Sequence, residues 1–419
     1  MAASYAATLG WLDGLDAARG MRLGLDRLFP VLELLGSPHK RLEVVHVAGT
    51  NGKGSSAAML DSIYREAGLS TGLYTSPHLC SFTERIRVDG RAIGENAVVL
   101  GIDRVRGAME ASGAELTYFE IATVLALMEF VAAGVDLAIV EVGLGGRLDA
   151  TNVVDGRVGL ITSIGLDHGA ELGTTFGAVA REKAGIMKAG MTVLAGRVAS
   201  EALAELEAAA ATAGARLRLL GRDFEVCDAA RSVGLAGAHQ VDNAALVCEA
   251  VQRGTVGGRV GQDAVRRGLA AVRWPARLET VSDAPRLILD SAHNPEGAAA
   301  LSRALADIAP DGPRVLVFGA MADKDWSAML DHLVPLFDEA VLVRPDQPRA
   351  ASPTLMKESF VAPGPATLMP VSAFDTAADG LSYATERAGE KGTVVVAGSV
   401  FLSAELYELA SGRSDPFAA

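Results

Sequence analysis

Short apolar runs rich in β-branched residues alternate along this chain with longer Ala- and Leu-rich segments of helical period. Leu42–Ala48 is a short run rich in β-branched residues, and Val135–Val142 and Arg157–Ile164 are almost continuously apolar. A strand that is apolar on both faces belongs in a parallel sheet that helices cover. The pattern therefore predicts an α/β fold.

A second series of the same kind occupies the C-terminal third of the chain. Its strand candidates are Leu287–Asp290, Arg314–Phe318, Ala340–Val343 and Thr393–Ala397. The stretch Trp274–Pro285 has two prolines and little periodicity, which is typical of a linker. Because 419 residues also exceed what one core usually supports, we expect two α/β domains, residues 1–275 and 276–419.

Composition and charge exclude several classes of protein. The net charge of −13 argues against non-specific binding to nucleic acid or to an anionic membrane. Acidic residues interrupt the longest apolar stretch, Thr123–Gly146, so it does not predict a membrane span. No signal peptide is recognisable, and Cys80, Cys227 and Cys248 lack metal-ligand spacing. We expect a cytoplasmic, monomeric protein with reduced cysteines.

The segment His46–Ser56 (HVAGTNGKGSS) lies between a predicted strand and a predicted helix. Gly49, Gly52 and Gly54 allow the backbone to approach phosphate oxygens, and Lys53 adds a mobile positive charge. The spacing departs from G-x₄-G-K-[ST], since Gly49 lies only three residues before Gly52. A plain glycine-rich turn with an exposed lysine is the alternative. The context favours a site for a nucleoside triphosphate, without indicating the reaction.

Two polar residues follow neighbouring predicted strands. Glu141 ends the run Val135–Val142, and an apolar strand that delivers one carboxylate beside a phosphate loop is typical of a Mg²⁺ site. His168 follows the next strand at the same edge, where open α/β sheets bind ligands. Glu141 could instead pair with Arg147. Imidazole is an unusual ligand for Mg²⁺, so chemistry alone favours His168 as a base or a phosphate partner.

Lys183 and Lys188 lie in a helix-like segment, REKAGIMK. On pattern alone, a solvent-exposed helical face is the favoured interpretation of both lysines.

Eight motifs occur in an order that identifies a known family. They are GTNGKGS (49–55), TSPHL (75–79), FTERI (82–86), EVGLGGRLDATN (141–152), LDH (166–168), EKAGI (182–186), HQxxNAA (239–245) and LDSAHNP (289–295). With these motifs the chain resembles the folylpolyglutamate synthases, which in bacteria are often bifunctional with dihydrofolate synthase and belong to the Mur ligase superfamily. The resemblance runs from about residue 20 to residue 400.

The resemblance implies an N-terminal ATPase domain of the P-loop type with a mostly parallel sheet, and a smaller, Rossmann-like glutamate ligase domain. The residues that it implies for ATP are Thr50, Asn51, Gly52, Lys53, Gly54, Ser55, Asn243, Arg277 and Asp290. Those for metal are Ser76 and Glu141 on one Mg²⁺, with His168 contributing to a second. Lys183 matches a lysine that is carbamoylated in the family, which overturns its interpretation as a surface residue.

The same resemblance implies residues for catalysis and for the second substrate. His293 matches a histidine that faces the reacting centre, beside Lys53 and Lys183. The stretches that match pterin-binding parts consist of Thr117, Tyr118, Phe119, Glu120, Leu148, Asp149 and Ala150. Phe119 could stack on a pterin and Asp149 could accept from its amino groups. A core position is the alternative for Phe119, since Thr117–Ala133 is apolar at helical spacing.

Two positions depart from the family pattern. Ser291 and Ala276 stand where glycine is usual. Neither change removes a charged or ligating group, so the departures concern local backbone shape.

The expected reaction is the ATP-dependent ligation of L-glutamate to a folate carboxylate, through an acyl phosphate. Dihydropteroate is expected as a further acceptor. One alternative is a peptidoglycan-type amino-acid ligase. Such enzymes carry a nucleotide-sugar domain before the phosphate loop, and the 48 residues before Gly49 are too few for that domain. The other is a non-catalytic nucleotide-binding protein, which would have no use for the LDSAHNP motif of a second domain.

Overall fold

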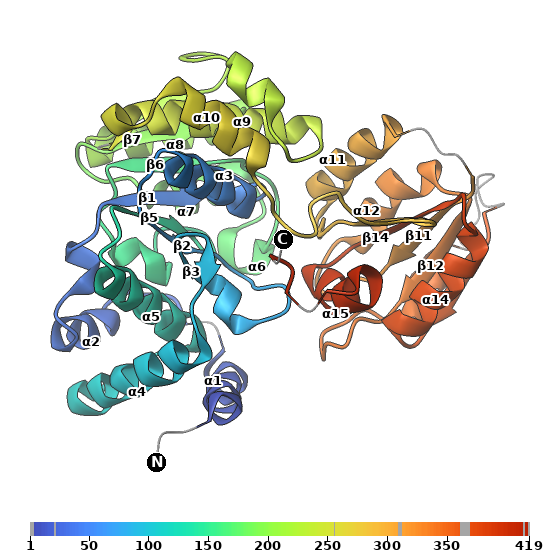
Figure 1. Ribbon diagram of the computed structural model, residues 1–419, viewed down its shortest axis with the longest axis horizontal. Coiled ribbons are helices and arrows are strands. Elements are labelled where there is room, and N and C mark those ends of the chain that lie inside the picture. Colours follow the sequence, from blue (N-terminus) through green and yellow to red (C-terminus); the bar gives the residue numbers. More distant parts are fainter. Residues whose placement is uncertain are drawn as a thin grey trace. The chain divides into compact units, whose positions relative to one another are not determined.

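The computed structural model describes residues 4–20, 22–254, 256–308, 312–360, 369–413 and 415–417. These residues form two compact units (Figure 1). Unit 1 comprises the residues up to His78, Phe82–Gly234 and Val241–Val272, and unit 2 comprises Leu79–Ser81, Leu235–Gln240 and the residues from Arg273 onward. Each unit has its own sheet.

The described part of unit 1 contains an eight-stranded sheet of order β4-β3-β2-β5-β1-β6-β7-β8. Its strands are β1 (Val44–Ala48), β2 (Thr71–Tyr74), β3 (Ile86–Val88), β4 (Arg91–Ala92), β5 (Leu137–Glu141), β6 (Val158–Ile161), β7 (Thr192–Ala195) and β8 (Arg216–Leu219). The six strands from β2 to β8 in this order run parallel, and β3 and β4 add an antiparallel edge. The carboxyl ends of β1, β2, β5 and β6 therefore meet at one edge of the sheet.

Helices cover both faces of this sheet (Figure 1). The helices up to residue 271 are α1 (Tyr5–Arg19), α2 (Leu28–Leu34), α3 (Lys53–Glu66), α4 (Glu95–Ser112), α5 (Tyr118–Ala133), α6 (Gly169–Leu172), α7 (Phe176–Ala184), α8 (Ser200–Ala213), α9 (Ala238–Arg253) and α10 (Gln262–Ala271). The 3₁₀ turns between them are η1 (Pro38–Lys40), η2 (Phe82–Arg85), η3 (Ala150–Val153), η4 (Asp228–Ser232) and η5 (Gly257–Arg259). Ala138 and Val140 of β5 pack with α4 and α5 in one apolar cluster, while α3 packs on β2, β5 and α10. This two-sided burial explains why β5 is apolar on both faces.

Unit 2 carries a smaller sheet of order β13-β12-β11-β14-β10-β9 within its described residues. Its elements are β9 (Glu279–Asp283), β10 (Arg286–Leu289), α11 (Pro295–Ala306), β11 (Arg314–Phe318), α12 (Trp326–Leu333), η6 (Val334–Leu336), β12 (Glu339–Val343), α13 (Pro353–Phe360), β13 (Val371–Phe374), α14 (Ala377–Ala388), β14 (Thr393–Ala397) and α15 (Val400–Ser411). Val315 and Val317 of β11 face the cluster of α14 and α15, whereas Leu316 and Phe318 face α11 and α12. Only β9 runs antiparallel to its neighbour in this sheet.

The predicted α/β class with two sheets is confirmed. The interpretation of Trp274–Pro285 as a plain linker is wrong, because β9 lies inside it. Four of the five residues of β9 are polar or charged, and none of the five is fully buried. An edge strand of this kind lacks the apolar run by which the inner strands were predicted.

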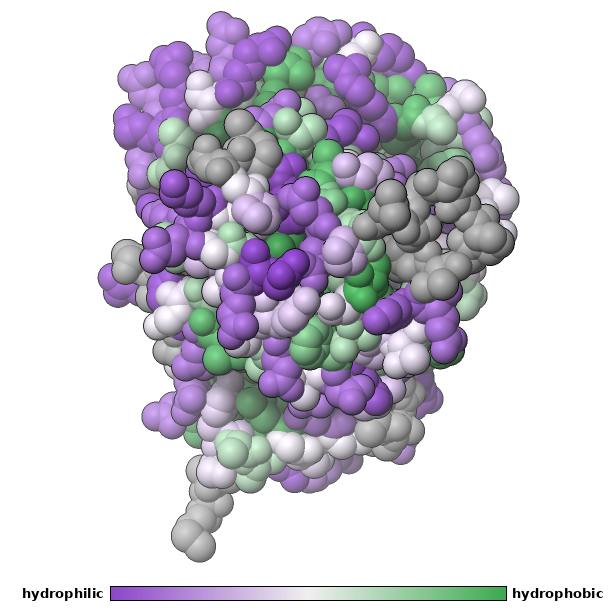
Figure 2. Space-filling model, turned by 90° about the vertical axis from the view of Figure 1, so that its right-hand side faces the viewer, coloured by the Kyte–Doolittle hydropathy of each residue, from purple (hydrophilic) through white to green (hydrophobic). Residues whose placement is uncertain are grey.

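The face of the molecule drawn in Figure 2 is largely polar, although half of the residues of the chain are hydrophobic. Hydrophilic residues cover most of the face that Figure 2 draws, and the apolar patches between them are small. Within the described ranges, no helix has the length and apolar character that crossing a membrane requires.

Candidate active site

The loop between β1 and α3 is held close to its neighbours by two glycines in left-handed conformations. A Cβ on Gly49 (φ 148°) would lie 1.9 Å from Thr162 Oγ1, and one on Gly52 (φ 86°) would lie 2.7 Å from Asn243 Oδ1. Side chains are therefore excluded at both positions. The contact also places Asn243, nearly 200 residues away in the sequence, against the predicted phosphate loop.

Hydrogen bonds fix this loop to the segment that follows β6. Thr50 N donates to Ser163 O at 2.9 Å, and Asn51 N donates to Ser163 Oγ at 2.9 Å. Thr50 Oγ1 also exchanges hydrogen bonds with the backbone of Gly165. Bonds within the protein thus hold the loop in a defined shape. Gly54 and Ser55 lie in the first turn of α3, where the helix N-terminus favours an anion.

Lys53 begins α3, and its Nζ donates to Thr50 O at 3.1 Å. The side chain therefore folds back over its own loop, and it is only partly buried. A lysine in this position can turn toward the terminal phosphates of a bound nucleotide.

Glu141 ends β5 and is buried, 4% exposed. Ser76 N donates to Glu141 Oε2 at 3.1 Å, so the loop after β2 meets the end of β5. This bond brings Ser76, whose side chain is a hydroxyl, to the Glu141 carboxylate at the ends of two adjacent parallel strands. Both supply the oxygen ligands that Mg²⁺ prefers.

Lys183, on α7, is buried, 3% exposed, and its Nζ donates to Gly49 O at 2.9 Å. Burial, with a smaller contribution from the nearby charge of Lys53, lowers the pKa of Lys183 to about 7. The structure thus contradicts the surface position that the sequence pattern alone favours. It places a buried amine, which is uncharged more often than that of an ordinary lysine, beside the phosphate loop.

His168 precedes α6 and has a left-handed backbone (φ 53°). Its backbone N–H donates to Asp167 Oδ1 at 2.8 Å, and its Nε2 lies 3.9 Å from the same oxygen. The residue follows β6 at the same edge of the sheet as Glu141, with β1 between β5 and β6.

The residues present suit a magnesium ion that substrate oxygens help to bind. Among the described residues, no three His, Cys, Asp or Glu side chains gather into a complete protein-only metal site. Mg²⁺ usually binds one or two carboxylates together with phosphate oxygens and water. The pairing of Glu141 with Ser76 beside the loop fits that mode.

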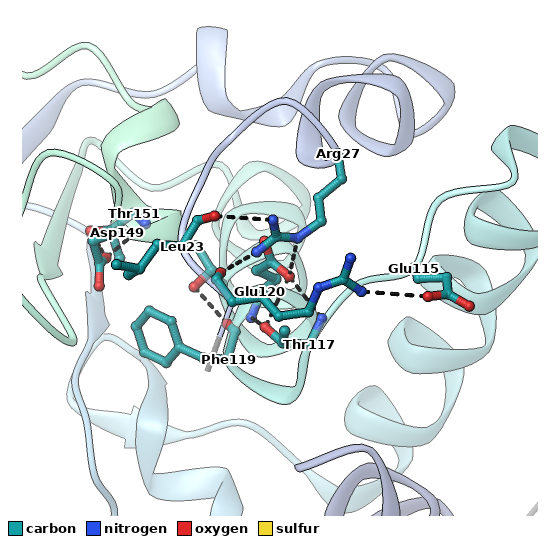
Figure 3. A network of polar contacts seen from close by, with 10 residues as sticks. Leu23, Arg27, Glu115, Thr117, Phe119, Glu120, Asp149 and Thr151 are labelled. Carbon is teal, nitrogen blue, oxygen red and sulfur yellow. Dashed lines mark hydrogen bonds and ion pairs between the residues drawn. The ribbon is translucent and has the colours of Figure 1, made fainter. Parts of the chain in front are cut away.

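The start of α5 forms a second polar centre, drawn in Figure 3. Thr117 caps the helix, and Glu120 Oε2 accepts from Thr117 N at 2.7 Å and from Thr117 Oγ1 at 2.9 Å. Arg27 then pairs with both oxygens of Glu120, at 3.0 and 2.8 Å. Both oxygens of the Glu120 carboxylate therefore bind protein groups, and they join the start of α5 to Arg27.

The Arg27 contact reveals a segment that the sequence analysis missed. The stretch Arg22–Arg27 lies against the predicted substrate residues, since Gly24 N also donates to Leu148 O at 3.4 Å. Leu23 in this stretch is a large apolar side chain that remains 47% exposed. In the sequence, this segment shows only two arginines and no periodicity, and these features do not indicate a substrate site.

The Asp149 carboxylate organises the loop that follows β5. It accepts from Leu144 N and Thr151 N, each at 2.9 Å, and from Thr151 Oγ1. His46 Nε2 lies 2.9 Å from Thr151 Oγ1, so a buried chain of hydrogen bonds stands behind the loop. Burial raises the pKa of Asp149, and the hydrogen bonds oppose that rise. Ala150 begins the turn η3 directly after it.

Phe119 is half-buried at the edge of the core. Its ring lies 6.0 Å from that of Tyr74, and a Cβ on Gly143 would lie 2.5 Å from Phe119 Cζ. The neighbouring Tyr118 packs edge-on against Phe82. Phe119 therefore packs on the core without being fully buried.

In unit 2, Asp290, at the end of β10, accepts from Leu278 N and from Ala292 N, each at 2.8 Å. Ser291 N donates to Ala276 O, and Arg277 NH1 bonds that same carbonyl at 3.0 Å. His293 Nδ1 lies 2.9 Å from Ser291 O. Arg277, Asp290 and His293 thus gather at the carboxyl end of β10.

The two departures from the family pattern have different local consequences. Ala276 is buried with φ 52°, a left-handed conformation that costs a non-glycine residue on the order of 1 kcal/mol. The usual glycine at this position is therefore explained by backbone shape. Ser291 is not left-handed, and its buried Oγ has no hydrogen-bond partner within the described structure.

Comparisons with known proteins agree with this architecture. The Mur ligase middle domain matches residues 47–192, and the Mur ligase glutamate ligase domain matches residues 276–400. The fold is similar to Escherichia coli FolC in complex with DHPP and ADP, with a TM-score of 0.88 and 33% identity over 99% of this chain and 100% of that one. A bifunctional folylpolyglutamate synthase/dihydrofolate synthase from Yersinia pestis, complexed with AMPPNP and Mn ion, gives a TM-score of 0.86 at 31% identity, over 98% of this chain and 100% of that one.

Curated relatives carry related names. A probable bifunctional folylpolyglutamate synthase/dihydropteroate synthase of Halobacterium salinarum is 38% identical over 93% of this chain, which spans 50% of that protein. The dihydrofolate synthase/folylpolyglutamate synthase of Escherichia coli is 34% identical over 98% of this chain and 97% of its own length. The chain therefore belongs to the dihydrofolate synthase/folylpolyglutamate synthase family, which is built from Mur ligase domains.

Proposed function

We propose that this protein is an ATP-dependent acid–amino-acid ligase that joins L-glutamate to the carboxylate of folates and of dihydropteroate. The observation that carries the proposal is the meeting of three features at one sheet edge in unit 1. These are the phosphate loop, the Glu141–Ser76 pair and the buried Lys183, whose amine bonds Gly49 O. The family relationship supplies the substrate class.

At the phosphate end, the backbone of residues 50–55 would cradle the ATP phosphates, and Lys53 would neutralise the transferred group. Glu141 and Ser76 would hold one Mg²⁺, and His168 would contribute to a second. The bound metal would supply charge neutralisation for phosphoryl transfer. A Yersinia pestis relative was solved in complex with AMPPNP and Mn ion, which supports the use of a divalent metal.

We assign ATP binding to residues 1–275 and glutamate ligation to residues 276–419. In unit 1, Asn243, which contacts Gly52, would bind the nucleotide; in unit 2, Arg277 and Asp290 are the candidates for nucleotide contacts. His293 would face the reacting centre. The enzyme would act as a monomer, which sedimentation velocity would check.

At the folate end, Phe119 would offer a face to a flat pterin ring, and Leu23 would cover the ring with an exposed apolar side chain. Leu148 and Ala150 would line the same pterin-binding site. Because Asp149 already accepts hydrogen bonds from its own loop, its main task would be to hold that loop in shape.

The reaction would proceed in two steps. The substrate carboxylate attacks the γ-phosphorus of ATP, and ADP leaves as the acyl phosphate forms. The free amine of glutamate then adds to the acyl carbon, and inorganic phosphate leaves as the amide forms. The proton that the amine loses must pass to a base at the centre, for which His293 is the candidate.

The direct test supplies ATP, labelled glutamate and either dihydropteroate or a reduced folate. We expect labelled dihydrofolate from the first acceptor and an elongated folate from the second. Phe119→Ala should weaken the use of both acceptors while leaving the KM for ATP unchanged, because the pterin contact is lost. The variant also loses packing against Tyr74, and its melting temperature would measure that separate loss.

The outcomes separate the alternatives. Product from reduced folate alone would make the protein monofunctional. ATP binding without either product would support the non-catalytic alternative, and ligation of a peptidoglycan precursor instead of a folate would support a peptidoglycan-type ligase.

Removing the Arg27 side chain tests the folate end separately. Without Arg27, the Arg22–Arg27 segment loses its bond to Glu120 and no longer stays against Leu148. We expect Arg27→Ala to raise the KM for dihydropteroate roughly tenfold, about 1.4 kcal/mol, with an unchanged KM for ATP.

Arg266→Ala is the matched control, since Arg266 pairs with Asp263 where both side chains are exposed, and such pairs contribute little. An equal rise of both KM values in Arg27→Ala would show a general loss of structure.

A further inference from the structure

Arg85 is a buried arginine to which none of the roles proposed above is assigned. It ends the turn η2 and is 9% exposed. Its Nε donates to His78 Nδ1 at 2.8 Å, and its guanidinium carbon lies 5.3 Å from the centre of the Tyr118 ring. A cation therefore lies inside unit 1, between the loop after β2 and the start of α5.

Neither of these contacts provides a negative charge. A His78 nitrogen that accepts a hydrogen bond carries no proton, and the face of Tyr118 offers only a cation–π contact. In the part of the chain that the structure describes, no carboxylate lies within ion-pair distance of Arg85, whereas Arg27 and Arg65 each pair with one. A buried charge is costly to leave without a counter-ion. The site therefore suits an anion from a ligand.

The position of Arg85 indicates which anion that is. Its carbonyl accepts from Thr75 N at 3.0 Å, directly before Ser76, which bonds Glu141. Its other partner, Tyr118, directly precedes Phe119. Arg85 thus joins the two segments, since its backbone bonds the residue before Ser76 and its guanidinium lies on the residue before Phe119. In dihydropteroate, the carboxylate that must react is attached to the aromatic ring that follows the pterin, so it would lie on the phosphate side of a bound pterin.

We propose that Arg85 binds the carboxylate of the pterin-bearing substrate and positions it for phosphorylation. A guanidinium can bind a carboxylate through two parallel hydrogen bonds, which fix its direction as well as its place. Nε is already committed to His78, so the terminal nitrogens would contact the substrate. This inference rests on the proposed function, because it names a contact within that same site.

The test compares two ligands that differ only in the carboxylate. Binding of dihydropteroate and of its decarboxylated analogue is measured by calorimetry with a non-hydrolysable ATP analogue and Mg²⁺ present. We expect Arg85→Gln to weaken dihydropteroate about 10- to 100-fold and to leave the analogue's affinity unchanged, since a charge-assisted pair is lost. Arg85→Lys keeps the charge but cannot form the two parallel hydrogen bonds, so its affinity for dihydropteroate should lie between those of wild type and Arg85→Gln.

Arg87→Gln is the matched control, because Arg87 is equally buried, lies two residues further on and bonds the carbonyl of Gly90. It should weaken neither ligand selectively. Equal weakening of both ligands by Arg85→Gln, or no weakening of either, would overturn the carboxylate contact. A wild type that ligates glutamate to no pterin acceptor would instead refute the proposed function itself.

Discussion

Lys53→Ala and Glu141→Gln should each reduce glutamate-dependent release of ADP by at least about 1000-fold, because phosphoryl transfer depends on charge neutralisation by lysine and metal. Lys53 is the cation of the phosphate loop, and Glu141 with Ser76 forms the proposed metal site. The measurement is steady-state ADP release with saturating folate and glutamate.

Both variants should keep the fold. Glutamine has nearly the same shape as glutamate and still offers an oxygen to Ser76 N, and Lys53 is only partly buried at the start of its helix. Circular dichroism and the melting temperature should therefore stay close to wild type. Lys40→Ala, which removes an exposed lysine of the same unit, serves as the control. Near-normal turnover in either folded variant would refute the site.

The strands that position this site were predictable from the sequence. β5 and β6 are buried on both faces, so hydrophobicity marks them without any knowledge of their partners. Glu141 was found because it ends such a strand. The antiparallel edge strands β4 and β9 escaped prediction, because partly exposed strands carry polar residues and no apolar run.

The polar contacts of the site depend on residues that are distant in sequence. The spacing of Thr117 and Glu120 is that of a capping box, which local reasoning can recognise. The pairing of Glu120 with Arg27 joins residues 93 positions apart, and nothing local indicates it. Lys183 shows the same limit, because its neighbours in sequence suggest a surface helix and only the fold places it against Gly49.

Lys183 should be carbamoylated in the active enzyme, and Lys183→Ala should lose most of the activity, with no recovery in added bicarbonate. The reaction joins the neutral amine to CO₂, releases a proton and leaves a carboxylate on the lysine. The lowered pKa of Lys183, about 7, favours carbamate formation, because more of its amine is uncharged at neutral pH than in an ordinary lysine. The new carboxylate would support the second metal and the transferred phosphate.

The pH dependence follows from the direction of that shift. The uncharged fraction of Lys183 rises as the pH increases through about 7, so carbamate should be abundant at pH 8 and should disappear well below pH 6. Carbon-13 NMR of protein equilibrated with labelled CO₂ would measure this. The signal should vanish in Lys183→Ala and persist in Lys188→Ala, since Lys188 pairs with Asp155. An unmodified amine in an active, metal-loaded complex would refute the carbamate, and the second metal would then need another ligand.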